Sequence, residues 1–275
     1  MKIIRFLSEN SQTLTGLYDP QCPEESRVIR GNVLGDFEIT SNRERIKRFL
    51  PPIEPCNILA LGLNYRKHAD ETKISHPEIP VLFIKATTSV VGHLSPILLP
   101  IAGSQEVDYE AELAIIIGKK IKNVPPDEAM DCILGYTCAN DVSARDWQMK
   151  KQKTQWARGK SFDTFCPLGP CLVTRDEIPD PDSLRIRTIL NGNTLQDSNT
   201  SDMIFGVATI VSDLSRSMTL LPGTVILTGT PEGVGFTRNP PVYLRDGDRV
   251  TIDIESIGQL TNPVKREGDN RQTKK

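Results

Sequence analysis

The chain has 275 residues, enough for one large domain with a small addition and for a substantial core. Its 33 basic and 35 acidic side chains give a formal charge of −2, which provides no electrostatic reason to expect a nucleic-acid or anionic-membrane partner. The six cysteines lack zinc-site spacing and no apolar run nears the roughly 20 residues of a membrane span, so we expect a cytoplasmic protein in reducing surroundings.

Proline residues divide the chain early. Residues 1–50 are polar and irregular in pattern, and three prolines between residues 51 and 55 precede a strongly apolar strand at 57–62. We expect a small N-terminal segment over 1–50 and a main body over 51–264. The charged stretch 265–275 shows no periodicity and is expected to be a flexible tail.

His68 and Glu71 follow directly on this first apolar strand. Residues three apart share a face of a helical turn, so the carboxylate can hold one imidazole nitrogen and make the other a better base. Pairs with this spacing are more often surface contacts. Their position after a rigid strand also makes them candidates for a catalytic lid.

The segment 106–118 carries acids at alternate positions. As a strand it would point Glu106, Asp108, Glu110 and Glu112 to one face and apolar side chains to the other. A buried row of carboxylates requires a cation or protons, and the all-oxygen donor set suits Mg²⁺, Mn²⁺ or Ca²⁺. A solvated acidic face explains this one strand equally well.

Asp141 supplies a further acid at a second strand end. It follows the apolar run 133–139, and strand ends are common positions for metal and substrate ligands. The alternative for this residue alone is an ordinary helix N-cap. Together with the acidic strand it favours a metal site.

Two later segments offer further polar groups. Lys160 lies between a basic stretch and an apolar strand, where it is either a solvated lysine or a group that stabilises an enolate oxygen. Ser161 lacks a nucleophile elbow and Cys166 has no identifiable base, which argues against covalent catalysis. Gly229 and Thr230 follow another apolar strand and offer an amide and a hydroxyl to a carboxylate, or form a structural turn.

Strand patterns outnumber helix patterns in the second half. Asn191-Gly192 predicts a tight hairpin between 187–190 and 194–196, and 249–255 alternates between apolar and polar residues. The clearest helix is expected over about 202–216, capped by Ser201 or Asp202. Without regular strand–helix alternation, we expect an α+β, mainly β fold.

Taken together, these segments resemble the fumarylacetoacetate hydrolase family over about residues 51–264. The resemblance is carried by GLNYRKHADE, FIK at 83–85, EVDYEAELAIIIGKK, NDVSARDWQ, GKSFDTFCPLGP, LNGNTLQ, LTGTPEGVGF and PPVYLRDGDRV. It implies a mixed β-sandwich roll with a few helices, usually assembled as a homodimer.

The resemblance also implies roles for individual residues, with Glu106 and Asp108 peripheral. The metal ligands would be Glu110, Glu112 and Asp141. The catalytic residues would be His68 and Glu71, which activate water, and Lys160, which stabilises an enolate. Substrate would be bound by Gln148 and Thr230, with Gly229 beside them, and Arg145 and Lys85 would support this substrate-binding group.

The implied chemistry is that of an enzyme using Mg²⁺ or Mn²⁺, with Ca²⁺ as an alternative, on a small 2-oxo acid through an enolate. We favour keto–enol tautomerisation of oxaloacetate. The alternatives are C–C hydrolysis of acylpyruvate or fumarylpyruvate substrates and decarboxylation of oxaloacetate. A rival of another class is a non-catalytic calcium-binding module.

Overall fold

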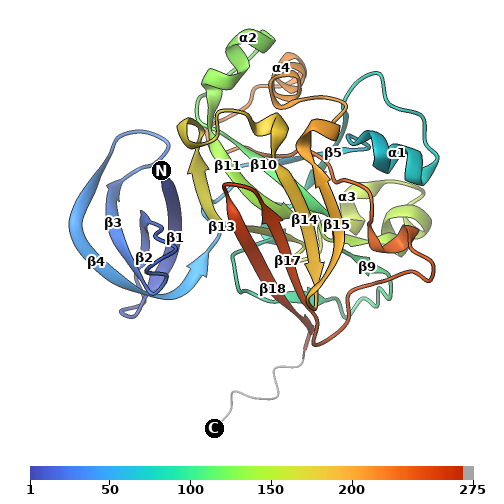
Figure 1. Ribbon diagram of the computed structural model, residues 1–275, viewed down its shortest axis with the longest axis horizontal. Coiled ribbons are helices and arrows are strands. Elements are labelled where there is room, and N and C mark those ends of the chain that lie inside the picture. The colour runs from blue at the N-terminus through green and yellow to red at the C-terminus, as the bar shows by residue number, and fades with distance from the viewer. Residues whose placement is uncertain (269–275) are drawn as a thin grey trace.

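The computed structural model describes residues 1–268 and is built around three β-sheets (Figure 1). The strands are β1 (Lys2–Ser8), β2 (Thr13–Leu17), β3 (Glu25–Gly31), β4 (Phe37–Leu50), β5 (Ile58–Gly62), β6 (Val81–Lys85), β7 (Val90–Val91), β8 (Ile97–Leu99), β9 (Val107–Asp108), β10 (Ala111–Ile117), β11 (Ile133–Asn140), β12 (Ser143–Ala144), β13 (Cys166–Thr174), β14 (Arg185–Leu190), β15 (Asn193–Asn199), β16 (Val225–Leu227), β17 (Arg249–Ile254) and β18 (Gly258–Arg266). The α-helices are α1 (Arg66–Thr72), α2 (Pro126–Ala129), α3 (Trp156–Gly159) and α4 (Val207–Ser217).

The largest sheet has eleven strands in the order β2-β3-β4-β1-β13-β11-β10-β16-β5-β6, with β7 beside β13. A five-stranded sheet runs β15-β14-β17-β18-β8, and β9 pairs with β12. Parallel pairs such as β16–β5 occur beside antiparallel ones. The expected α+β, mainly β class with mixed sheets is therefore confirmed.

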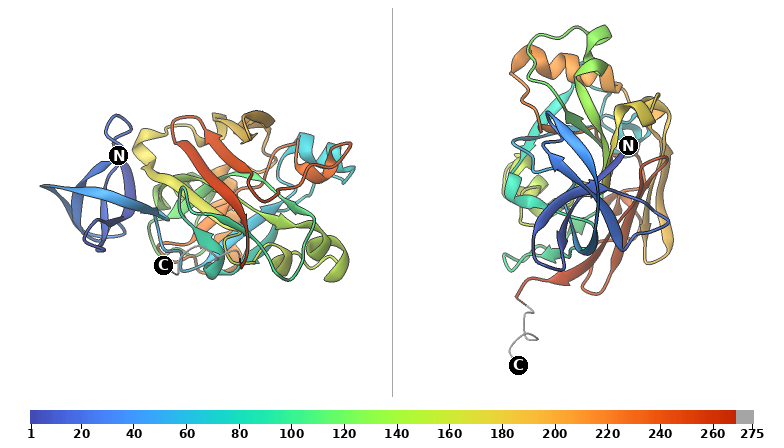
Figure 2. Two further views of the ribbon diagram at one scale, coloured as in Figure 1. Left: turned by 90° about the horizontal axis from the view of Figure 1, so that it is seen from below. Right: turned by 90° about the vertical axis from the view of Figure 1, so that its left-hand side faces the viewer.

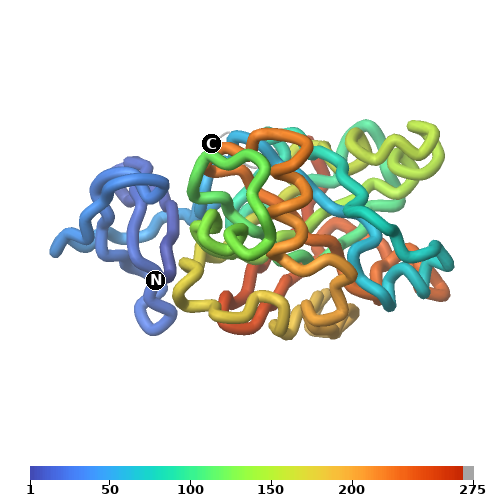
Figure 3. The backbone as a smooth tube through the Cα atoms, turned by 90° about the horizontal axis from the view of Figure 1, so that it is seen from above, coloured from blue at the N-terminus to red at the C-terminus, as the bar shows by residue number. Residues whose placement is uncertain are grey.

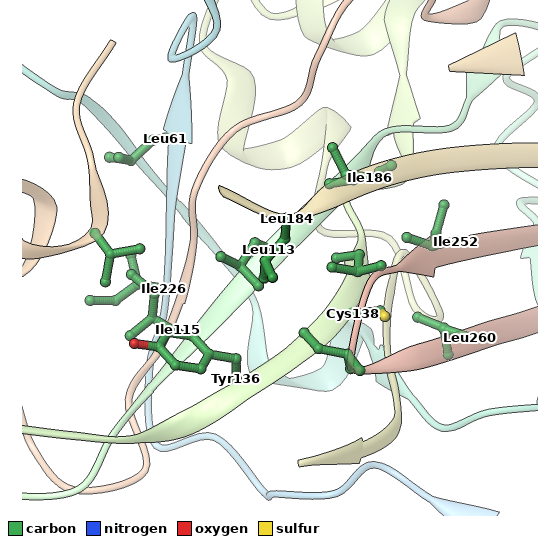
Figure 4. Close-up of a cluster of buried hydrophobic side chains, with 14 of the residues drawn as sticks. Leu61, Leu113, Ile115, Tyr136, Cys138, Leu184, Ile186, Ile226, Ile252 and Leu260 are labelled. Atoms are coloured by element: carbon green, nitrogen blue, oxygen red, sulfur yellow. The ribbon is translucent and has the colours of Figure 1, made fainter. Parts of the chain in front are cut away.

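The main core lies between the two larger sheets. Leu113 and Ile115 of β10 pack there against Ile186 of β14 and Ile252 of β17 (Figure 4). On the opposite face of β10, Ala114 joins a second apolar cluster, so this strand is buried on both faces. Deleting such a side chain costs about 2–5 kcal/mol. The strand that leads into the acidic cluster is thus firmly held.

The predicted hairpin and the predicted alternating strand are both present. Asn191 and Gly192 adopt φ of +52° and +85° between β14 and β15, as a tight turn with two left-handed residues requires. Val250, Ile252 and Ile254 are the buried residues of β17. Local turn chemistry and period-two patterning were sufficient to predict these elements.

The expectation of irregular structure in residues 1–50 was wrong. They form β1 to β4, which extend the large sheet and stand at one end of the molecule (Figure 2). Ile3 of β1 pairs with Leu172 of β13, and Ile4 and Phe6 are buried. These four strands pair mainly with one another, and the β1–β13 pair attaches them to the main body.

Two further boundaries need correction. Helix α4 begins at Val207 rather than near Asp202, because Gly206 is its N-cap and the Asp182 carboxylate accepts the Val207 amide. It lies beside α2 (Figure 3). Lys265 and Arg266, expected in the tail, belong to β18. The rest of that predicted tail, from 269 onward, lies outside the described residues.

No helix among residues 1–268 is long and apolar enough to cross a membrane.

Candidate active site

Three acids meet where two neighbouring strands of the large sheet end. Antiparallel pairing sets Glu112 of β10 opposite Ala139 of β11, so Glu110 lies beside the residue that follows β11, Asp141. The Asp141 amide donates to the Glu110 carbonyl at 2.9 Å. One carboxylate oxygen from each of Glu110, Glu112 and Asp141 lies within 4.8 Å of the others, and all three residues are buried.

The acidic segment is not one continuous strand with a wet face. It breaks at Tyr109 and Glu110, between β9 and β10. Glu106 turns outward to Lys150 at 2.7 Å. Only Glu110 and Glu112 reach the acidic cluster, as the family resemblance implied.

Three buried cations surround these acids. Lys160 Nζ lies 2.7 Å from Glu110, 2.6 Å from Asp141 and 2.8 Å from the Ser143 hydroxyl. Arg145 lies 2.7 Å from the other oxygen of Glu110. Lys85 bonds the second oxygen of Asp141. Unpaired buried charges cost several kcal/mol, so this cross-pairing is what allows the carboxylates to stay charged.

Glu112 is the exception. Within the described chain no cationic side chain lies at ion-pair distance from it, and its one polar partner is the Gly229 amide at 2.7 Å. Burial, together with Asp141 and Glu110, raises the pKa of Glu112 well above its ordinary value. Burial acts in the same direction on Glu110, but Lys160 and Arg145 outweigh it and lower that pKa to about 2.

This imbalance tests whether a metal fits the cluster. A divalent cation would take the place of the proton that Glu112 otherwise holds, since this acid has no cation at ion-pair distance among the described residues, and each carboxylate oxygen keeps lone pairs beyond those given to Lys160 and Arg145. The three donors are oxygens, as Mg²⁺, Mn²⁺ and Ca²⁺ prefer. Glu110, Glu112 and Asp141 therefore fit a hard divalent ion.

Asp108 supports the site from behind. Its carboxylate accepts Arg145 Nε at 2.9 Å and the amides of Gly235 and Phe236 at 2.8 and 3.0 Å. Burial, only partly offset by Arg145, raises its pKa. The residue is peripheral to the acidic cluster, as expected, but it fixes the guanidinium that faces Glu110.

His68 and Glu71 form the predicted pair on α1. His68 Nδ1 lies 3.1 Å from Glu71 Oε2, and the helix ends one residue later at Thr72, with Lys73 as its C-cap at a φ of +58°. Burial would raise the pKa of Glu71, but hydrogen bonds from His68, Thr237 and the Gly233 amide lower it. The carboxylate is thus held ionised against the imidazole.

A cavity of about 70 Å³ brings most of the predicted residues together. Its size suits a small ligand. A turn of π-helix, Asp146–Lys151, carries Gln148 into this cavity, and Arg145 Nη1 donates to the Gln148 amide oxygen at 3.0 Å. Its polar lining comprises His68, Thr72, Glu110, Glu112, Arg145, Gln148, Lys160 and Thr230.

Lys85 and Gly229 lie outside that lining. The Lys85 side chain is 0% exposed and bonds Asp141 and the Lys160 carbonyl from behind, so it is not placed to contact substrate. The Gly229 amide is already occupied by Glu112. Both support ligands, and the expectation of substrate contact for them needs correction.

An apolar wall was not predicted. Phe83 and Trp156 meet edge to face at 5.7 Å, and Lys160 Nζ lies 5.0 Å from the centre of the Phe83 ring. A Cβ on Gly62 would lie 2.1 Å from the Trp156 ring, so only glycine admits this arrangement. Nothing in the sequence around Gly62 or Trp156 indicated the contact.

The fold and this cavity define the chain as an enzyme. The family model described as fumarylacetoacetate (FAA) hydrolase C-terminal matches residues 57–265, more than half of the sequence. The chain belongs to the fumarylacetoacetate hydrolase family. This confirms the resemblance read from the motifs, and the non-catalytic calcium-binding module is not supported.

Several proteins are similar in sequence or structure to most of this chain. A Xenopus laevis protein named oxaloacetate tautomerase fahd2, mitochondrial, is 50% identical over 257 residues, covering 90% of this chain and 80% of the relative. The human oxaloacetate tautomerase FAHD2A, mitochondrial, is 46% identical over 217 residues, covering 78% of this chain and 69% of the relative. The solved structure of 5-carboxymethyl-2-hydroxymuconate delta-isomerase from Mycobacterium smegmatis is similar with a TM-score of 0.85 at 41% identity, covering 97% of this chain and 100% of its own.

Proposed function

We propose that this enzyme interconverts the keto and enol forms of oxaloacetate with the help of a divalent metal ion. Two of its relatives are named for that reaction. The observation that carries the proposal is Glu112, a buried acid that has no cationic partner within residues 1–268 and faces the same cavity as His68. Such a site is prepared for a metal and for proton transfer beside it.

Glu110, Glu112 and Asp141 would hold Mg²⁺ or Mn²⁺, with Ca²⁺ as an alternative. A bound divalent ion supplies a Lewis acid that lowers the free energy of an enolate. Near those acids, the Lys160 ammonium provides a fixed positive charge for the oxygen that becomes negative.

His68 moves the proton. Because Glu71 accepts a hydrogen bond from Nδ1, that nitrogen carries the hydrogen and Nε2 is left as the base. Nε2 removes a proton from C3, the C–H electron pair becomes the C2–C3 double bond, and O2 takes the negative charge. Protonation of O2 gives the enol, and the reverse steps regenerate the ketone.

Arg145, Gln148 and Thr230 orient the substrate. All three line the cavity, and Arg145 is itself fixed by Asp108 and Glu110. A fixed guanidinium and neutral hydrogen-bonding groups suit the carboxylate of a small 2-oxo acid. The limited volume excludes large substrates.

The test follows the ultraviolet absorbance of the oxaloacetate enol with Mg²⁺ or Mn²⁺ and then with a chelator. We expect interconversion well above the buffer rate only with metal, and a loss of at least about 1,000-fold in Glu112→Gln. No acceleration under any metal condition would reject the proposal. Parallel assays of pyruvate release and acylpyruvate cleavage detect the decarboxylase and the C–C hydrolase instead.

Cytoplasmic location and a homodimer remain predictions. The names of the relatives place those proteins in mitochondria. Light scattering after gel filtration measures the oligomeric state, and imaging of the tagged chain in its own cell gives the location.

A further inference from the structure

The carboxylate of Glu71 is held by more than its histidine. The Thr237 hydroxyl lies 2.8 Å from Oε1, and the Gly233 amide lies 3.1 Å from Oε1 and 3.3 Å from Oε2. His68 occupies Oε2. Both oxygens therefore have donors, and two of the three donors come from one loop, residues 233–237.

Two sides of the cavity can be distinguished: the acidic wall, which carries Glu110, Glu112 and Asp141, and the histidine wall, which carries His68 and Glu71. The same loop also reaches the acidic wall. Its Gly235 and Phe236 amides bond Asp108, which fixes Arg145. The loop approaches closely, since a Cβ on Gly235 would lie 2.5 Å from Asp108 Oδ1. From this loop only backbone amides contact Asp108, whereas Glu71 accepts both the Gly233 amide and a side-chain hydroxyl, that of Thr237. A substitution at Thr237 can therefore alter one wall and spare the other.

We propose that Thr237 is a positioning residue that orients Glu71 and so fixes the tautomer of His68. The proposal rests on the proposed function only in assigning His68 the proton transfer. The hydroxyl has one hydrogen and two acceptors in reach, Glu71 at 2.8 Å and the Val234 carbonyl at 2.9 Å. The charged carboxylate is the stronger acceptor.

Without the hydroxyl, Oε1 loses its shortest donor, and the carboxylate is free to rotate away from Nδ1. Neutral imidazole then divides between its two tautomers, and only the form with hydrogen on Nδ1 presents a basic Nε2. Partners that orient a catalytic histidine from a distance are typically worth about 10–100-fold in activity.

A second histidine provides an internal reference. His93 Nδ1 lies 3.0 Å from the Thr261 amide, which can only donate, so His93 carries its hydrogen on Nε2. Burial and the charge of Arg249 lower its pKa to about 4, which keeps it neutral at ordinary pH. The protein thus contains two imidazoles with opposite tautomers, and only three histidines in all.

The experiment measures the NMR chemical shifts of the histidine ring nitrogens in metal-free protein whose histidines carry a nitrogen isotope label. The pH is about 8, above the ordinary histidine pKa. His68→Asn assigns the His68 signals. We expect distinct protonated and unprotonated ring nitrogens for His68 in the wild type, and converging shifts in Thr237→Val and Thr237→Ala. Thr237→Ser should restore the wild-type shifts. Thr40→Val, which removes a remote hydroxyl, and the His93 signals should not change.

Kinetics of the metal-loaded enzyme give the second readout. We expect kcat of Thr237→Val to fall about 10–100-fold, with KM and the metal concentration for half-activation within about twofold, and Thr237→Ser to recover most of the loss. An unchanged His68 tautomer in both hydroxyl-free variants, or equal loss of metal affinity, overturns the proposal. If the tautomer shifts but the wild type does not act on oxaloacetate, the proposed reaction fails and the positioning role stands.

Discussion

The two walls of the cavity are built in different ways. The acidic wall is formed where β10 begins and β11 ends in the large sheet, and its three acids are buried. Glu110 and Asp141 are paired with Lys85, Arg145 and Lys160, whereas Glu112 has no cationic partner within residues 1–268. The histidine wall is a seven-residue helix whose Glu71 side chain remains 25% exposed. The Glu71 carboxylate is held by hydrogen bonds from one loop, residues 233–237.

The difference follows from what each wall has to hold. Buried charges tolerate no mispairing, because one uncompensated ion costs several kcal/mol, so they require strands and matched cations. A proton carrier needs a defined direction but no net charge, and hydrogen bonds on a short element can supply this. Substitution of the paired charges in the first wall should therefore change stability as well as activity, whereas substitutions in the second wall should change activity alone.

The largest effects should come from two matched substitutions in the acidic wall. Glu110→Gln and Glu112→Gln should each reduce metal-dependent turnover by at least about 1,000-fold. In the metal-free protein, however, only Glu110→Gln should lower the free energy of unfolding strongly, by about 3–5 kcal/mol, because it removes one of the two carboxylates that each of the buried cations Lys160 and Arg145 is paired with. Glu112→Gln removes an acid that has no cation and should be nearly neutral.

Urea unfolding with and without Mn²⁺ measures both consequences. Manganese at about 100 times its Kd should stabilise the wild type by about 2.7 kcal/mol and neither variant. Equal destabilisation by both substitutions would show that Glu112 has a cationic partner after all, and the contrast within the acidic wall would be lost.

The next largest effect concerns His68→Asn in the helical wall. Loss of the proton carrier should lower kcat about 10²–10⁴-fold while stability and manganese affinity remain close to wild type. Initial rates at saturating metal, combined with the same unfolding series, provide the measurement. If acylpyruvate cleavage is lost while tautomerisation survives, His68 serves only the activation of water, and its role as C3 base is wrong.

These contrasts also show what the sequence could and could not predict. Alternation along 106–118 placed Glu110 and Glu112 on one face, and the strand end placed Asp141, because both depend on local periodicity. Alternation did not separate these ligands from Glu106 and Asp108; the family resemblance did. The break at Tyr109 that sends the four acids in different directions is set by tertiary contacts.

Long-range partners were the main source of error. Lys85 and Lys160 look alike as lysines beside apolar strands, yet one lies behind Asp141 and the other faces the cavity. Strand β1 joins the main body through its pairing with β13, more than 160 residues away. Helix α4 starts where Asp182 can accept the Val207 amide. None of these contacts has a local sequence signal.

A smaller effect is expected where the walls join. Gly62 ends the strand before α1 and lies against Trp156, which precedes Lys160 by four residues. Gly62→Ala should push the indole away, raise KM about tenfold and cost about 1–3 kcal/mol of stability, since the added methyl overpacks the contact. Steady-state kinetics and tryptophan fluorescence test this. Unchanged fluorescence with unchanged KM would mean that the aromatic wall does not shape the cavity.

The smallest effect should be on the pH dependence of the free energy of unfolding, and it should arise outside both walls, at His93. Its sign is opposite to that of the pH dependence caused by Glu112. The folded-state pKa of His93 is lowered to about 4 by burial and Arg249, so its contribution to stability is full above about pH 6.5 and is lost as the pH falls toward 4. The raised pKa of Glu112 does the reverse, since stability from holding that proton is lost as the pH rises above 4.5 in metal-free protein.

Urea unfolding of Glu112→Gln between pH 7 and 4.5 isolates the His93 effect, which we expect to be about 1–2 kcal/mol for this partly exposed group. Adding His93→Gln should flatten the plot of unfolding free energy against pH. His76→Gln, on the surface beside Asp70, should leave that plot unchanged. If the profile stays equally steep without His93, other groups cause the acid sensitivity. A flatter plot of unfolding free energy against pH would distinguish the acid sensitivity caused by His93 from the pH dependence caused by Glu112 in the metal-free site. His93 lowers stability as the pH falls, whereas Glu112 lowers it as the pH rises.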